Sequence, residues 1–228
     1  MSELLRSRSN SVDPARVTET RAGEDLALRR PGHALRALAV DARAEAPVRT
    51  FLAQLMGVHT QERAWRLGAA GEVLVAAQLA KLIARDPRWH CLHSVPVGTN
   101  DADIDHLVIG PGGVFTLNAK NHPDARIWVA GDTVMVNGVR APYVRNSRHE
   151  ARRASRLLSA ACGFPVTAMG VVVPVNARDL TIKKAPVDVE VMNRRRLRRW
   201  LRRRPEVLDV CVVDAIFEQA RRSATWIG

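Results

Sequence analysis

The chain has 228 residues, which is enough for one large domain or for one domain with an appendage. Its apolar content of 46% is normal for a globular protein, and no segment approaches the roughly 20 consecutive apolar residues of a transmembrane helix. The formal net charge of +12 is concentrated in residues 141–228, which hold 18 basic and eight acidic side chains. Such an excess suits a polyanion such as nucleic acid. However, Arg outnumbers Lys 31 to 4, and a compositional bias explains the charge equally well.

Cysteine usage indicates a reducing compartment. Cys91, Cys162 and Cys211 are odd in number and far apart, so they match neither a disulfide framework nor a zinc-binding spacing. The first residues contain no apolar segment of the kind that a secretory signal needs. We therefore expect a cytoplasmic protein without membrane attachment.

In chain order, residues 1–57 are expected to form a partly disordered, partly helical N-terminal extension, and residues 58–228 one folded domain. The domain opens with a predicted helix over residues 60–84, where apolar residues recur at spacings of three and four. This helix contains the segment GAAGE, from Gly68 to Glu72. Each glycine weakens a helix by about 1 kcal/mol relative to alanine, so the pair indicates that another backbone approaches closely.

Alternating and continuous apolar patterns then predict strands over residues 89–97, 104–109, 114–120, 126–130 and 133–136. A helix over residues 145–161 follows, and then strands over 166–175 and 187–192. Two helices, over 194–203 and 206–226, end the chain. This order predicts an α/β fold with a mixed sheet flanked by helices, an antiparallel meander and a later crossover.

The segment DIDHLVIGPGGVFTLNAKN, residues 103–121, predicts a β-hairpin. If residues 110–113 form a four-residue loop, Ile109 faces Val114. The same register sets Leu107 opposite Thr116, Asp105 opposite Asn118 and Asp103 opposite Lys120. Side chains alternate along a strand, so all of these share one face. The other face is expected to pack in the core through Ile104, Val108, Phe115 and Leu117.

The shared face brings polar groups together at the open end of the hairpin. Directly paired Cβ atoms are about 4.5–5.5 Å apart, which would let Asp105 and Asn118 ligate one hard cation through oxygen. The ordinary alternative is a hydrogen bond between these two residues and an ion pair between Asp103 and Lys120 on a solvated sheet. Lysine is scarce in this arginine-rich chain, which favours a specific role for the compact ammonium of Lys120.

Together with GAAGE and the later strand VVVPVN, this hairpin resembles the nuclease-related (NERD) domain of the PD-(D/E)xK nuclease superfamily. The resemblance covers residues 63–200 and implies a restriction-endonuclease-like core. It also implies a magnesium-dependent phosphodiesterase site made of a helix glutamate, a strand aspartate and an acid-x-lysine pair. Glu72, Asp105 and Lys120 match this pattern. Asn118 departs from it, because the family pattern has Asp or Glu at that position.

Phosphodiester hydrolysis needs an activated water and a stabilised negative charge, and oxygen-ligated Mg²⁺ or Mn²⁺ provides both. The resemblance therefore assigns Glu72, Asp105 and Asn118 to the metal, and Lys120 to the water. Asn118 keeps a ligand oxygen but removes one negative charge. A catalytically degenerate nucleic-acid-binding module on the same fold thus stays open as the alternative. A third reading is a structural or partner-binding protein whose arginines reflect composition alone.

Two basic helices complete the prediction of a nucleic-acid partner, with DNA favoured. The helix over residues 145–161 aligns four arginines on one face, which the resemblance places beside the cleft: Arg145, Arg148, Arg152 and Arg156. A solvated basic face is the alternative. In RRRLRRWLRRR, residues 194–204, eight arginines surround an apolar stripe, and we expect contact with the DNA backbone rather than with a membrane. His106 is expected to pack rather than to bind a metal.

Overall fold

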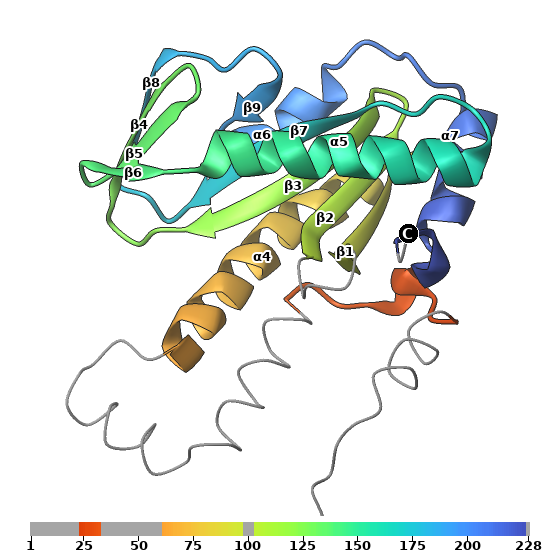
Figure 1. Cartoon of the computed structure of the whole chain (residues 1–228), viewed down its shortest axis with the longest axis horizontal. Helices are drawn as coiled ribbons and strands as arrows, with labels where there is room; N and C mark the ends of the chain where they lie inside the picture. Colours follow the sequence, from red (N-terminus) through yellow and green to blue (C-terminus); the bar gives the residue numbers. More distant parts are fainter. Residues whose placement is uncertain (1–22, 33–60, 98–102, 227–228) are drawn as a thin grey trace, which may run out of the picture.

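The computed structural model describes residues 23–32, 61–97 and 103–226. Most of the predicted N-terminal extension lies outside the described residues, as do residues 98–102. The described part confirms the predicted mixed α/β fold: two mixed sheets are flanked by helices (Figure 1).

The larger sheet has five strands in the order β1-β2-β3-β7-β9. Their bounds are His90–Pro96 for β1, Asp103–Gly110 for β2, Gly113–Asn121 for β3, Ala168–Val175 for β7 and Val189–Val191 for β9. The first three strands are antiparallel neighbours, whereas β7 and β9 run parallel to β3. The predicted meander and the later crossover are therefore both present.

The smaller sheet has four strands in the order β6-β5-β4-β8. It consists of β4 (Arg126–Ala130), β5 (Thr133–Val136), β6 (Val139–Ala141) and β8 (Asp179–Lys184). The sequence predicted the β4–β5 hairpin but neither β6 nor β8. Both missed strands are short and mostly exposed, so they lack the apolar pattern by which a strand is recognised.

Helices cover both faces of the larger sheet. On one face, α4 (Gln61–Ile83) and α6 (Arg194–Arg202) pack through Val75, Leu79 and Leu82, and through the stripe residues Leu197 and Leu201, all of which are buried. On the other face, α5 (Tyr143–Cys162) and α7 (Val210–Ala220) pack through Leu157, Leu158, Val213 and Ile216. In Figure 1, α5 crosses in front of the sheet. The predicted helix over residues 206–226 is in fact α7 followed by a short 3-10 helix, η2 (Ser223–Trp226).

This arrangement corrects the expected polarity of the β2–β3 hairpin. The face that carries Asp105 was expected to be polar, but Leu107, Ile109 and Val114 on it belong to the core beneath α5 and α7. The opposite face is buried as well, through Val108, Phe115 and Leu117. Alternation identifies which residues share a face, but it does not tell whether a helix covers that face. Only the open end of the hairpin remains polar.

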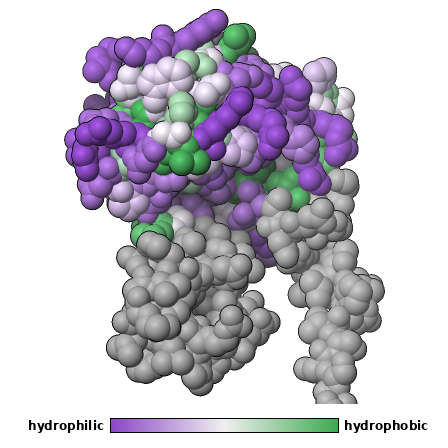
Figure 2. All heavy atoms as spheres, turned by 60° about the vertical axis from the view of Figure 1, so that its left-hand side comes forward, coloured by the Kyte–Doolittle hydropathy of each residue, from purple (hydrophilic) through white to green (hydrophobic). Residues whose placement is uncertain are grey.

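A further short segment packs on the domain from the N-terminal side. The 3-10 helix η1 (Leu26–Leu28) contacts β1 and lies beside η2, where the backbone N–H of Leu26 donates to the carbonyl of Arg221. The described surface turned forward in Figure 2 is mostly hydrophilic, with hydrophobic residues in small separate spots. Within residues 23–32, 61–97 and 103–226, no helix combines the length and the apolarity that crossing a membrane requires.

Candidate functional site

Polar side chains from three elements meet at the open end of the β2–β3 hairpin. β2 and β3 pair from His106–Leu117 to Gly110–Gly113, which leaves a loop of two residues rather than the predicted four. Beyond Leu117, two adjoining pockets of about 680 and 500 Å³ open beside the strands. They share Asp103, Asn118, Lys120 and Tyr143. The cleft therefore lies where the sequence predicted a site.

Glu72 reaches this cleft from α4 and is only 2% exposed. Its Oε2 accepts a 2.8 Å hydrogen bond from the backbone N–H of Gly32. Burial raises the pKa of Glu72 to about 8, and the negative charges of Asp105 and Asp103 add to this effect. Glu72 and the two aspartates therefore line one pocket and influence one another electrostatically.

The two β2 aspartates are held differently. Asp105 accepts a 2.6 Å hydrogen bond from the backbone N–H of Ala119 instead of facing Asn118 in the strand ladder, as the register predicted. Burial raises the pKa of Asp105, although the charge of Lys120 and this hydrogen bond oppose the shift. Burial and the charge of Asp105 raise the pKa of Asp103 to about 6. The Oδ2 atom of Asp103 is buried and has no hydrogen-bond partner among the described residues.

Asn118 joins two charged groups through its side-chain amide. Its Oδ1 accepts a 2.8 Å hydrogen bond from Nζ of Lys120, and its Nδ2 donates a 2.7 Å hydrogen bond to Oε2 of Glu150 on α5. Asn118 itself is 8% exposed, whereas Lys120 and Glu150 are half-buried. The ordinary alternative included an ion pair between Asp103 and Lys120, but among the described residues Lys120 instead contacts Asn118.

Glu150 is the site residue that the sequence did not predict. Burial raises its pKa to about 8, and the charge of Asp105 contributes in the same direction. Its second oxygen, Oε1, is buried without a hydrogen-bond partner in the described part of the chain. The helical spacing of α5 predicted a face of arginines, but no sequence pattern around Glu150 indicates that it belongs to the site. Only the packing of α5 across β3 brings it to the hairpin.

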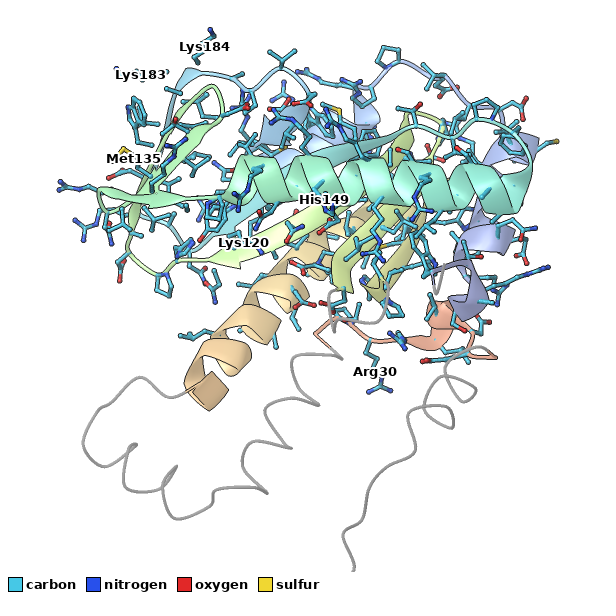
Figure 3. The ribbon with its side chains drawn as sticks, viewed as in Figure 1. Arg30, Lys120, Met135, His149, Lys183 and Lys184 are labelled. Atoms are coloured by element: carbon cyan, nitrogen blue, oxygen red, sulfur yellow. The ribbon has the colours of Figure 1, made fainter. Side chains whose placement is uncertain are left out.

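The side of α5 that turns toward the cleft carries further polar residues. Tyr143, Asn146, His149 and Arg153 line the larger pocket together with Glu150. Figure 3 shows His149 on α5 and Lys120 on β3 below it. Nε of Arg153 is buried without a hydrogen-bond partner among the described residues. The cleft therefore offers cationic and neutral donors next to its carboxylates.

The four arginines predicted to bind phosphates differ in their surroundings. Arg145, Arg152 and Arg156 are exposed on α5, and Arg145 also lines the larger pocket. Arg148 instead donates four hydrogen bonds of 2.6–2.8 Å to the carboxylates of Asp132 and Asp188. Its guanidinium ties the β4–β5 turn to the segment before β9. Three of the four side chains are thus free to meet a polyanion.

A second cluster lies on β1 and β2. Cys91, His93 and His106 each offer one ligand atom, and these atoms lie within 4.8 Å of one another. Nδ1 of His93 and Nδ1 of His106 are 2.8 Å apart. Burial lowers the pKa of His93 to about 4. Sulfur and nitrogen donors suit a softer metal than Mg²⁺. The sequence did not reveal the cluster because it joins residues of two strands. All three cysteines are free.

Comparison with known proteins confirms the resemblance predicted from the sequence. The family model described as NERD, nuclease-related domain, matches residues 67–175, which include Glu72, Asp105, Lys120 and Glu150. An uncharacterized protein of Bacillus anthracis is 35% identical over 96 residues, which span 37% of this chain and 43% of the relative. The chain therefore covers less than half of that relative's length. No solved structure matches the chain significantly.

Proposed function

We propose that this chain hydrolyses phosphodiester bonds in DNA with a divalent cation, Mg²⁺ or Mn²⁺, because residues 67–175 match the model of the nuclease-related domain family. The observation that carries the proposal is the gathering of the buried Glu72 and the half-buried Asp103 and Asp105 at the open end of the hairpin. Glu72, Asp103 and Asp105 line one pocket, and the pKa of each is raised. Carboxylates so arranged repel one another when they are ionised, and a cation bound between them relieves that repulsion.

The donor chemistry suits a hard cation, although no three of the described carboxylates have oxygen atoms within 4.8 Å of one another. The pocket presents oxygen atoms from Glu72, Asp105 and Asn118, the three residues predicted to hold the metal. The unpartnered Oδ2 of Asp103 adds a further oxygen. Oxygen ligands from carboxylates and amides are those that Mg²⁺ and Mn²⁺ prefer. When bound there, such a cation would polarise a phosphate oxygen and lower the pKa of a water.

Lys120 is placed to assist at the reacting phosphate. The hydrogen bond from Lys120 to Oδ1 of Asn118 holds the ammonium in the pocket that Glu72, Asp103 and Asp105 also line. From there Lys120 can orient the attacking water and offset the negative charge that develops on the phosphate. Arg153 and His149, which line the adjoining pocket, are placed to hold neighbouring phosphates.

The exposed arginines of α5 extend this binding surface along the helix. Arg145 borders the pocket, and Arg152 and Arg156 follow it at helical spacing. Contacts of this kind bind the backbone of DNA without reading its sequence. We place this activity in the cytoplasm, in keeping with the three free cysteines.

A cleavage assay tests the proposal. The purified protein is incubated with single-stranded, duplex and branched DNA in Mg²⁺ or Mn²⁺, and EDTA serves as the metal-free control. We expect cleavage of at least one form, its loss in EDTA, and its loss in Lys120→Ala. Lys81→Ala, which removes an exposed lysine of α4 outside the site, is expected to cleave like the wild type. Absence of cleavage for every form of DNA, and for RNA tested alongside, would refute the enzymatic function.

Asn118 supports one alternative function. An amide at this position carries no charge, which lowers the negative charge available to a cation on β3 itself. A nucleic-acid-binding module that has lost catalysis would bind DNA in a salt-dependent manner. That binding would persist in EDTA and in Asp105→Ala. Metal-independent binding without cleavage would therefore favour the alternative over the nuclease.

A further inference from the structure

The strand position two residues before Lys120 carries an amide, and helix α5 places a carboxylate directly against it. Asn118 lies on β3, and Nδ2 of its side chain donates to Oε2 of Glu150 at 2.7 Å. The two residues are 32 positions apart in the chain. A carboxyl group therefore lies beside position 118, although it comes from a different element.

The second oxygen of Glu150 is available to a ligand. Oε1 is buried and has no hydrogen-bond partner among the described residues, and these residues also offer Glu150 no ion pair. A buried carboxylate with an unsatisfied oxygen is costly unless a positive group completes its surroundings. The nearby charges are mainly of the same sign, because Glu150 lies within electrostatic reach of Asp105 and Asp103. A cation bound at Oε1 of Glu150 would supply the missing partner and offset the like charges of Asp105 and Asp103.

We propose that Glu150 supplies the metal-binding carboxylate that the strand position of Asn118 lacks. The inference rests on the proposed function, because it concerns the same cation. It also gives Asn118 a different role. Since the amide nitrogen holds Glu150 and the amide oxygen holds Lys120, Asn118 is a positioning residue that sets the separation of the carboxylate and the ammonium.

Exchanging the two functional groups tests this assignment. Glu150→Gln removes the charge but keeps an oxygen that can accept from Asn118. The double variant Asn118→Asp/Glu150→Gln returns the carboxylate to β3 and reverses the hydrogen bond, because the new amide on α5 then donates to the new carboxylate on β3. Mg²⁺ is the probe, because softer ions would also bind at Cys91, His93 and His106. The dissociation constant is measured by isothermal titration calorimetry on the full chain, and urea unfolding confirms that each variant is folded.

We expect Glu150→Gln to weaken Mg²⁺ binding by about tenfold or more, because it removes one charged ligand. The double variant should recover most of this loss. Asp179→Asn, which neutralises an exposed carboxylate on β8, should bind Mg²⁺ like the wild type. Cleavage should follow the same order as Mg²⁺ affinity.

Two results would overturn the assignment. Wild-type affinity in Glu150→Gln would show that this carboxylate is no ligand, and so would a double variant as weak as Glu150→Gln. If Asp105→Asn still loses Mg²⁺ binding, either result leaves the proposed function standing and rejects only the role of Glu150. If the wild-type protein binds no Mg²⁺, the proposed function itself is refuted.

Discussion

Gly71 of α4 approaches Asn121 of β3 so closely that a Cβ atom at position 71 would lie 2.9 Å from Cβ of Asn121. The contact confirms that GAAGE lets another backbone come near the helix. Asn121 also donates a 2.6 Å hydrogen bond to the carbonyl of Leu67, one turn earlier in α4. The helix is thus fixed against the end of β3, and Glu72, the next residue after Gly71, is fixed with it.

The first prediction concerns this contact. Gly71→Ala should lower the free energy of unfolding by about 1–3 kcal/mol, because the added methyl group overpacks the interface. The direction of the change in stability is diagnostic. Alanine by itself stabilises a helix by about 1 kcal/mol relative to glycine, so a loss of stability points to the close contact with β3. The same variant should weaken Mg²⁺ binding, because it displaces Glu72. Urea unfolding and calorimetry measure the two effects.

Ala77→Gly provides the control for Gly71→Ala. Ala77 is exposed on α4, so the substitution destabilises the helix by about 1 kcal/mol without altering the contact with β3. Its Mg²⁺ affinity should stay at the wild-type value. If Gly71→Ala were as stable as the wild type, the close packing of α4 on β3 would be excluded.

The second prediction concerns pH. Glu72 has a pKa of about 8 in the folded protein and 4.5 as its ordinary value. Between these values the folded state binds more protons than the unfolded state, so the free energy of unfolding falls as pH rises from about 4.5 to about 8. In EDTA, Glu72→Gln should therefore lose less stability than the wild type across this window. Urea unfolding at a series of pH values measures the difference.

Asp179→Asn controls for the general effect of removing a carboxylate, and its pH profile should run parallel to that of the wild type. Saturating Mg²⁺ should flatten the wild-type profile, because a cation favours the ionised carboxylates. Parallel profiles of Glu72→Gln and the wild type in EDTA would contradict the burial of an ionisable Glu72 among like charges.

The third prediction separates the arginines of α5. Alanine at Arg145, Arg152 or Arg156 should weaken DNA binding, and each phosphate that is no longer neutralised should reduce the slope of log affinity against log salt by about one. Alanine at Arg148 should instead lower the urea midpoint, because it releases Asp132 and Asp188. Fluorescence anisotropy at several salt concentrations measures the affinities. Equal effects of all four substitutions on DNA affinity would show that the ion pairs of Arg148 with Asp132 and Asp188 do not keep it from binding DNA.

Much of the site followed from local sequence. The alternation on both sides of the Gly-Pro-Gly-Gly segment fixed the hairpin register from Ile109–Val114 to Leu107–Thr116, which the structure confirms. Local pattern also identified the helix that carries Glu72 and the apolar stripe of Leu197 and Leu201. These features depend on neighbours within a few residues, which is the range that periodicity describes.

The remainder depends on packing between distant segments. Glu150 joins the cleft only because α5 lies across the sheet, and Gly32 reaches Glu72 from 40 positions away. The side chain of Asp105 accepts a hydrogen bond from the backbone of Ala119 just beyond the last residue pair of the β2–β3 ladder. Alternation alone does not show where the ladder ends, so this contact could not be predicted from it. No pattern of spacing within one element contains this information.

The central claim is that the carboxylates gathered at the open end of the hairpin hold a divalent cation. Titration of Mg²⁺ into the wild type and into Asp105→Asn tests it most directly, because asparagine keeps an oxygen that can accept from Ala119. We predict binding to the wild type and its loss, or a weakening of at least about tenfold, in Asp105→Asn. Equal binding by the two proteins, or no binding by the wild type, would contradict the claim.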